Sequence, residues 1–436
     1  MDKRSLQVVL ALMICILTGC DAFCLGCPTV TPSPTAEPPT STPEPSEPLQ
    51  VAYIKNGDVW IWVWDKEFSI HRRLTCDGSA LEVRISSDRQ VMAYRTIGEE
   101  LKAIQVKGID LRVLDPNVVD LCTVVKHITL IDKNYLDGLN VHGGKGATIR
   151  TFEFAGNTHT LYFNVDVVGV AGGVDLFAIT IENLLPTRLV APGQGGNFFI
   201  SPSGQWMVIT IPNQLILSKA NGDNAKIIFT FPPICAFGSH EGPEVVWKHD
   251  SSGFYVVTPK IVEEALFGHS ILYFVDIYGN ISSRVELLAL PHAETHISPE
   301  GTYVVNMIDY GDLIDLHLIE PATGSDSEYI SYPKDEINLV AWSPDELGFI
   351  YWLGKPESRK FYYGRQGTAP FQVITDYVVH ALPGDIIPFE WADNESFVFI
   401  GVMNGQKHLV LYSLAGNVKT PMLIDMVDNS FDIPDN

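Results

Sequence analysis

The stretch HAETH, residues 292–296, holds residue types that suit a transition metal. On an extended strand His292, Glu294 and His296 point to one side, and imidazole together with carboxylate is a ligand set that such metals accept. One strand cannot easily wrap three adjacent side chains around a single ion, and His292 is expected in the preceding loop. The simpler interpretation is a loop that leads into a strand, and we expect neither a metal nor a cofactor.

Other short catalytic motifs are absent or incomplete. The stretch HGGKGAT (142–148) has glycine after its lysine, where a phosphate-binding loop needs Ser or Thr to ligate magnesium. Neither G-x-S-x-G nor H-E-x-x-H occurs. Acidic residues do recur at one position in a repeated turn, and we interpret them as structural: Asp88, Glu300, Asp345 and Asp393.

The N-terminus has the pattern of an export signal. Lys3 and Arg4 precede an apolar run over 6–17, which is too short to span a bilayer comfortably. The run ends at LTGC, which resembles a bacterial lipobox. That resemblance implies that residues 1–19 are a signal peptide and that Cys20 becomes the lipid-anchored first residue. The alternative is a conventional signal peptide with an incidental cysteine.

The segment after Cys20 is rich in Pro, Thr, Ser and Glu and has almost nothing to bury. Such a composition favours extended, disordered chain. We therefore predict a disordered stalk over 20–48 and a folded domain over 49–436. With the lipobox, this predicts a protein of the bacterial cell envelope, anchored to the membrane by lipid and facing the extracytoplasmic side.

The chain has seven cysteines, of which Cys76, Cys122 and Cys235 lie in the predicted folded domain. Export permits disulfides, and we predict a Cys76–Cys122 pair. The formal net charge is −23. It argues against a nucleic-acid partner, which needs a basic surface to displace counterions, and against direct adhesion to anionic lipid headgroups.

One pattern recurs throughout the folded domain: an apolar anchor, a turn of Ser, Pro, Asp or Gly, and a β-rich run. Successive anchors are 45 to 50 residues apart, except for a first interval of 69. This period predicts the four-stranded antiparallel blades of an all-β propeller. The long first interval predicts an insertion over about 126–147. The anchors are Ile85, Phe154, Ile200, Trp247, Ile297, Trp342 and Trp391.

The two ends of the domain complement each other. The first unit (51–75) has three strands and no anchor strand, and the terminal SFDIPDN supplies an anchor and a turn, with Ile433 placed 42 residues after Trp391. Pairing of the C-terminal strand with the N-terminal blade would remove two free sheet edges. This predicts eight blades; the alternative is seven blades with an irregular N-terminal segment.

Two stretches carry a family resemblance: AYIKNGDVWIW (52–62) and WSPDE (342–346). They resemble the repeats of TolB-like β-propellers, and the likeness extends over 49–436. It implies the fold and says little about function, because propellers host many unrelated activities. The lipid-type signal and the absence of a preceding α/β domain depart from TolB itself, so no partner is carried over.

These features predict a propeller that acts as a binding or scaffolding module for an unknown protein or glycan. Trp60, Trp62 and Trp64 share one strand face, which could stack on sugar rings or, more simply, pack against a neighbouring blade. The alternative function is a carbohydrate-active hydrolase or lyase at the channel mouth. That enzyme would need paired carboxylates at a defined spacing, so whether the protein is an enzyme stays open, with binding favoured.

Overall fold

The computed structural model describes residues 48–65, 68–109, 111, 119–139, 147–156, 158–167, 174–211, 213–230, 243, 245–259, 268–289, 294–333, 337–354, 359–374, 389–414, 422–425 and 427–434. Nearly all regular structure in these residues is β-strand, and α2 (Lys133–Gly138) is a helix of six residues. No helix in this described part is long and apolar enough to cross a membrane. The predicted signal peptide and nearly all of the predicted stalk lie outside it.

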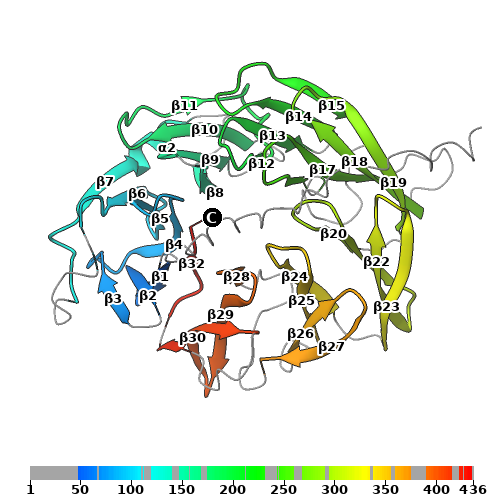
Figure 1. The fold of residues 1–436 in the computed structure, drawn as a ribbon. Helices are drawn as coiled ribbons and strands as arrows, with labels where there is room; N and C mark the ends of the chain where they lie inside the picture. Colours follow the sequence, from blue (N-terminus) through cyan, green and yellow to red (C-terminus); the bar gives the residue numbers. More distant parts are fainter. Residues whose placement is uncertain are drawn as a thin grey trace, which may run out of the picture. The chain divides into compact units, whose positions relative to one another are not determined.

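The strands form eight four-stranded antiparallel sheets, the blades of a β-propeller. Figure 1 shows the sheets following one another around a ring, with the first strand of each blade toward the centre. The predicted fold class and the predicted count of eight blades are both confirmed. We number the blades 1 to 8 and give their strands from the inside outward.

Blade 1 contains β32 (Phe431–Asp432), β1 (Leu49–Lys55), β2 (Asp58–Trp64) and β3 (Ser69–Arg73). Blade 2 contains β4 (Ala80–Ile85), β5 (Val91–Thr96), β6 (Leu101–Gln105) and β7 (Lys126–Ile131). Blade 3 contains β8 (Ala147–Phe154), β9 (Thr160–Val167), β10 (Val174–Thr180) and β11 (Thr187–Arg188). Blade 4 contains β12 (Asn197–Ile200), β13 (Trp206–Ile211), β14 (Gln214–Lys219) and β15 (Lys226–Thr230).

Blade 5 contains β16 (Val245–Trp247), β17 (Gly253–Pro259), β18 (Gly268–Asp276) and β19 (Ile281–Ala289). Blade 6 contains β20 (Glu294–Ile297), β21 (Val304–Asp309), β22 (Leu313–Glu320) and β23 (Ser325–Pro333). Blade 7 contains β24 (Ile337–Trp342), β25 (Gly348–Leu353), β26 (Lys360–Arg365) and β27 (Thr368–Val373). Blade 8 contains β28 (Phe389–Trp391), β29 (Ser396–Met403), β30 (Gln406–Ser413) and β31 (Met422–Asp425).

The ring closes as the terminal SFDIPDN predicts. β32 pairs antiparallel with β1, with Ala52 opposite Asp432 and Tyr53 opposite Phe431. The C-terminal strand thereby becomes the inner strand of the blade that the N-terminus begins. This pairing covers the inner edge of β1, which would otherwise present unpaired backbone groups.

Within the described residues the core consists of eight apolar clusters, one at each junction between neighbouring blades. Each sheet is therefore covered on both faces, which explains why strands such as β13 and β25 are apolar on both sides. The junction between blades 8 and 1 has its own cluster, in which Trp62 packs with Val398 and Leu409 while Trp60 and Trp64 pack against its margin. The tryptophan face thus contributes to blade packing.

The repeated serine holds the turn that joins the first two strands of a blade. In blade 7 the Ser343 carbonyl accepts from the Glu346 N–H, and the Ser343 hydroxyl oxygen accepts from the Gly348 N–H at 3.0 Å. Ser86, Ser201 and Ser298 make the equivalent bonds in three other blades and are also almost fully buried. The motif therefore recurs because it satisfies buried backbone groups.

The structure places a blade strand and a short helix within the range that was predicted as an insertion, 126–147. Lys126–Ile131 is β7, a regular outer strand that pairs with β6, and the short α2 follows it. Part of the extra length lies earlier, between β6 and β7, where residues 119–121 contact Arg73 of β3 in blade 1. The first part of the predicted insertion is therefore a regular blade strand, and its residues 140–146 lie outside the described residues.

Candidate functional site

One position repeats on every inner strand: the residue immediately before the anchor. In four consecutive blades, 8, 1, 2 and 3, this residue is charged: Glu390, Asp432, Arg84 and Glu153. In blades 4 to 7 the position is occupied by Phe199, Val246, His296 and Ala341. Each of these eight residues lies opposite the equivalent position of the next strand outward. The inner strands thus divide into a charged sector (blades 8, 1, 2 and 3) and an uncharged sector (blades 4 to 7).

Two carboxylates of the charged sector bind the backbone of the following blade. Glu390 Oε2 accepts from the Ile433 N–H at 2.6 Å, and Asp432 Oδ2 accepts from the Ile85 N–H at 2.7 Å. Hydrogen bonds to a charged acceptor are stronger than neutral ones. These two acids therefore connect the inner strands of blades 8, 1 and 2 in sequence around the ring.

Arg84 stands at the corresponding position of blade 2, where its guanidinium meets several acids. Its Nη2 contacts Glu82 Oε1 at 3.0 Å, its Nη1 donates to the Val83 carbonyl at 2.9 Å, and its guanidinium carbon lies 5.7 Å from the centre of the Phe152 ring. Burial acts against the charge on this side chain. Nearby carboxylates outweigh burial and raise the pKa of the Arg84 guanidinium above its ordinary value; they belong to Asp432, Glu82, Glu390 and Glu153.

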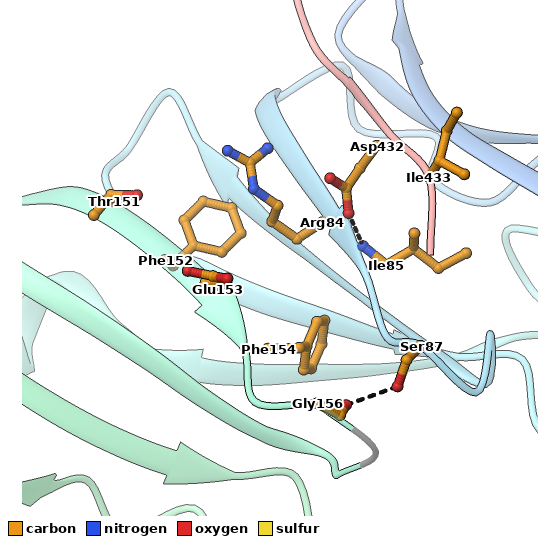
Figure 2. Close-up of a pocket in the computed structure, with 10 residues that line it drawn as sticks. All are labelled: Arg84, Ile85, Ser87, Thr151, Phe152, Glu153, Phe154, Gly156, Asp432 and Ile433. Carbon is orange, nitrogen blue, oxygen red and sulfur yellow. Dashed lines mark hydrogen bonds between the residues drawn. The ribbon is translucent and has the colours of Figure 1, made fainter. Parts of the chain in front are cut away.

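A pocket of about 200 Å³ opens between the inner strands of blades 1, 2 and 3. Figure 2 shows Arg84, Glu153 and Asp432 around it, together with the Phe152 and Phe154 rings. Its lining includes residues of the turns of blades 2 and 3, where the Ser87 hydroxyl donates to the Gly156 carbonyl at 2.7 Å. The pocket therefore combines one cation, two carboxylates, hydroxyl groups and aromatic carbon, which suits a small polar ligand.

The other predicted site residues are placed as follows. Cys20 and His292 lie outside the described residues. Glu294 belongs to β20, the inner strand of blade 6, where it pairs with Met307, and half-buried His296 pairs with Val305 on the same strand. The expectation that no metal binds at this strand stays a prediction.

Among the described side chains, three metal-type ligands come together at Cys76, Asp120 and Cys122. The two cysteines there form a disulfide, with their Cα atoms 5.9 Å apart. Cys76 follows β3 of blade 1, and Cys122 lies in the connection between β6 and β7 of blade 2. The bond therefore links blades 1 and 2 on the side away from the inner strands.

The recurring turn acids hold the turns and their neighbours. Asp88 Oδ1 accepts from the Ser86 hydroxyl and the Gln90 N–H, and Asp345 Oδ1 accepts from the Ser343 hydroxyl in the same way. Glu300 Oε1 accepts from the backbone of the preceding blade, at the His249 N–H. These contacts agree with a structural role.

No short motif marks the four charged inner-strand residues, which are Arg84, Glu153, Glu390 and Asp432. Each stands one position before an anchor, so the only signal in the sequence is a charge that recurs at this position of the repeat. Only the closed ring shows that they are spatial neighbours, because blade 8 and blade 1 meet through the two ends of the chain.

No family model matches the chain, and no curated protein matches it in sequence. Solved structures do resemble it. A eukaryotic initiation factor structure is 12% identical, with 88% of this chain and 86% of that one covered and a TM-score of 0.50. Dipeptidyl peptidase 4 of Porphyromonas gingivalis is 11% identical, with 78% and 52% covered and a TM-score of 0.50. TolB of Acinetobacter baumannii is 12% identical, with 65% and 68% covered and a TM-score of 0.35.

At these identities the matches concern the fold alone. The chain spans about half the length of the peptidases that it matches, such as acylaminoacyl peptidase of Pyrococcus horikoshii, of which it covers 46%. The class that the fold defines is the eight-bladed β-propeller, closed by its own C-terminal strand.

Proposed function

We propose that this protein is an envelope lipoprotein whose propeller binds a small polar ligand in the pocket between blades 1, 2 and 3. The observation that carries the proposal is the convergence of Arg84, Glu153 and Asp432 on a pocket of about 200 Å³. That volume equals the liquid volume of about seven water molecules. It admits a small molecule or the terminal unit of a larger glycan or peptide.

Binding fits the inner-strand acids better than hydrolysis does. Glu390 and Asp432 each accept a backbone N–H of the next blade, so they already hold the ring together. A pair of catalytic carboxylates must instead act on the substrate from a defined separation. The geometry therefore supports a recognition site.

The binding proposal is tested by ligand capture. The full chain is immobilised, exposed to an envelope extract, washed and analysed for retained small molecules by mass spectrometry. Thr151→Trp fills the pocket, because Thr151 lines it, whereas Thr187→Trp places the same ring on an exposed strand. We expect compounds that the wild type and the Thr187 variant retain and the Thr151 variant loses. Equal retention by all three proteins would contradict the proposal.

Membrane anchoring is tested at the lipobox. Cys20→Ser removes the predicted acylation site, and Cys27→Ser changes a nearby cysteine and serves as the control. We expect the wild type and the Cys27 variant in the membrane fraction, with lipid on their N-terminal residue by mass spectrometry. Retention of that modification by the Cys20 variant would show that the anchor lies elsewhere.

A further inference from the structure

We propose that Asn404 is a site of spontaneous covalent modification, at which the side-chain amide is lost and the backbone can isomerise. The chain has three Asn-Gly pairs, at 56–57, 221–222 and 404–405. A glycine after the asparagine favours this reaction, because it has no side chain to hinder attack by its backbone nitrogen. The inference goes beyond the proposed function and does not depend on it. The sequence makes the three pairs equivalent, and the structure distinguishes them.

The reaction needs only water. The Gly405 nitrogen loses its proton and attacks the side-chain carbonyl carbon of Asn404. The new C–N bond closes a cyclic imide, and the side-chain nitrogen takes up a proton and leaves as ammonia. Water then opens either carbonyl of the imide, which gives aspartate or isoaspartate at position 404. The requirement on the structure is therefore a glycine N–H that is free to lose its proton and a side chain that is free to meet it.

The N–H of Gly57 is held by a carboxylate. It donates to Asp428 Oδ2 at 2.9 Å, and the Asp428 N–H in turn donates to the Ile54 carbonyl at 2.8 Å. A negative charge at the acceptor opposes loss of the proton. The turn is also confined, because a Cβ added to Gly57 would collide with the Gly78 carbonyl oxygen. We therefore expect Asn56 to react slowly.

The N–H of Gly222 is held within its own turn. It donates to the Lys219 carbonyl at 2.8 Å. The Asn221 side chain is engaged as well: its Oδ1 accepts from the Asp223 N–H at 3.0 Å, and its Nδ2 donates to Asp223 Oδ2 at 2.8 Å. A Cβ added to Gly222 would collide with the Leu189 carbonyl oxygen. Both reacting groups of this pair are therefore restrained.

The pair at 404–405 has no such restraint. Asn404 and Gly405 form the exposed turn between β29 and β30 of blade 8, at φ values of 53° and 78°. Within the described part of the chain, neither the Gly405 N–H nor the Asn404 side chain has a hydrogen-bond partner. A Cβ added to Gly405 would meet no heavy atom within 4 Å beyond its chain neighbours. The structure thus leaves this pair alone able to react freely.

The modified residue would lie close to the segment that closes the ring. Isoaspartate adds a carbon atom to the backbone, and a two-residue hairpin turn that sets the register of its strands has no room for it. The Lys407 carbonyl, on the strand that follows the turn, accepts from the Val427 N–H at 3.3 Å, and the Lys407 ammonium bonds with Asn429 Oδ1. These contacts hold the chain that leads into β32. We therefore expect the modification to weaken the closure.

Ageing of the full chain tests the inference. Protein in detergent and protein unfolded in urea are incubated side by side at mildly alkaline pH, and peptide mapping with chromatography and mass spectrometry follows all three sites. In the folded protein we expect Asn404 to react at least about tenfold faster than Asn56 or Asn221, because each of those pairs must first break a hydrogen bond. In urea the three rates should converge.

Two results would overturn the inference. Equal rates at the three sites of the folded protein would mean that the hydrogen bonds of Gly57 and Gly222 give no protection. The same preference for Asn404 in urea would mean that neighbouring residues in the sequence, and not the fold, select the site.

A variant tests the cause of protection. Asp428→Ala frees the Gly57 N–H, and we expect the reaction at Asn56 to become about tenfold faster. Asn221 and Asn404 of the same molecule are internal controls and should keep their rates. An unchanged rate at Asn56 would contradict the protection assigned to Asp428. Acceleration at Asn221 as well would show that the variant acts by unfolding the chain, and the comparison in urea then decides.

A second variant tests the consequence for the closure. Asn404→Gly cannot undergo the reaction, and glycine suits the positive φ of the turn. After ageing, the melting temperature of wild type should fall, whereas that of Asn404→Gly should stay the same. An equal fall in both proteins would contradict the expected effect on the closure.

Discussion

The inner strands of blades 8, 1, 2 and 3 differ from those of blades 4 to 7. At one equivalent position the first group has Glu390, Asp432, Arg84 and Glu153, and the second has three apolar residues and a histidine. All eight junctions have an apolar cluster, so both groups share the same kind of core. The difference is confined to the innermost strands.

The charged sector coincides with the place where the ring is not covalently continuous. Blade 1 is completed by a strand from the other end of the chain: two residue pairs of the described residues join β32 to β1, and Ile54 of β1 also exchanges backbone hydrogen bonds with Asp428 and Ser430. Side chains of the terminal segment add contacts to blade 2, where the Ser430 hydroxyl accepts from the Val83 N–H at 3.1 Å and Asp432 accepts from the Ile85 N–H. Polar contacts at the inner strands therefore strengthen the closure, and the same groups shape the pocket.

The largest expected effect is at the closing strand. Phe431→Ala removes a side chain that is 3% exposed within the cluster between blades 8 and 1. We expect the free energy of unfolding in urea to fall by about 3–5 kcal/mol, the usual cost of such a truncation in a core. Phe371→Ala is the matched control at a residue that is 51% exposed. A similar loss of unfolding free energy in both variants would mean that the closing strand contributes no more to stability than an exposed residue does.

The next effect is at the disulfide between blades 1 and 2. Replacing Cys76 and Cys122 with serine should lower the free energy of unfolding by about 2–4 kcal/mol, because the unfolded chain loses a constraint. The melting temperatures of the wild type and the double variant, each with and without a reductant, test this loss of stability. Reductant should lower the melting temperature of the wild type and leave that of the double variant unchanged. A wild type that does not respond would contradict the prediction.

A smaller effect is expected at the acid that binds blade 2. Asp432→Ala leaves the Ile85 N–H without its acceptor and should cost about 1–3 kcal/mol. Asp432→Asn keeps an acceptor oxygen of the same reach and should recover much of that loss. Urea unfolding of the two variants measures the difference. If both variants lose the same unfolding free energy, the negative charge of Asp432 stabilises the contact between the two strands, and its hydrogen bond does not.

The smallest effect concerns pH. Burial alone would raise the pKa of Asp88, but hydrogen bonds from Ser86, Gln90 and His159 outweigh it and hold this pKa below the ordinary 3.8. A carboxylate with a lowered folded-state pKa stabilises the protein above the unfolded value, and this contribution disappears as the pH falls through the folded value. The stability difference between wild type and Asp88→Asn should therefore shrink below about pH 3.8. A difference that is constant with pH would contradict the assignment.

Much of the fold could be predicted because its signals are local. Turns of Ser, Pro, Asp or Gly recur at intervals of 45 to 50 residues after the first interval, and a serine at the start of such a turn satisfies a backbone group within it, as Ser343 does with Gly348. The outer strand β7 does alternate, with Ile128 and Leu130 buried and Thr129 exposed, but it lies in the long first interval between anchors, where the repeat assigns no position to it. The pocket escaped prediction because its residues come from three blades, and a residue such as Glu153 has no local feature that distinguishes it from an ordinary surface acid.

Local sequence patterns predict the class of fold, and they favour eight blades closed by residues 431–433 over the alternative of seven. They do so because period, turn chemistry and a missing first strand are properties of neighbouring residues. The tertiary structure alone decided which side chains meet. Asp432 reaches Ile85, and Arg84 stands among acids from blades 8, 1, 2 and 3, because closure brings both ends of the chain to one place. Contacts of that kind depend on the curvature of the whole ring.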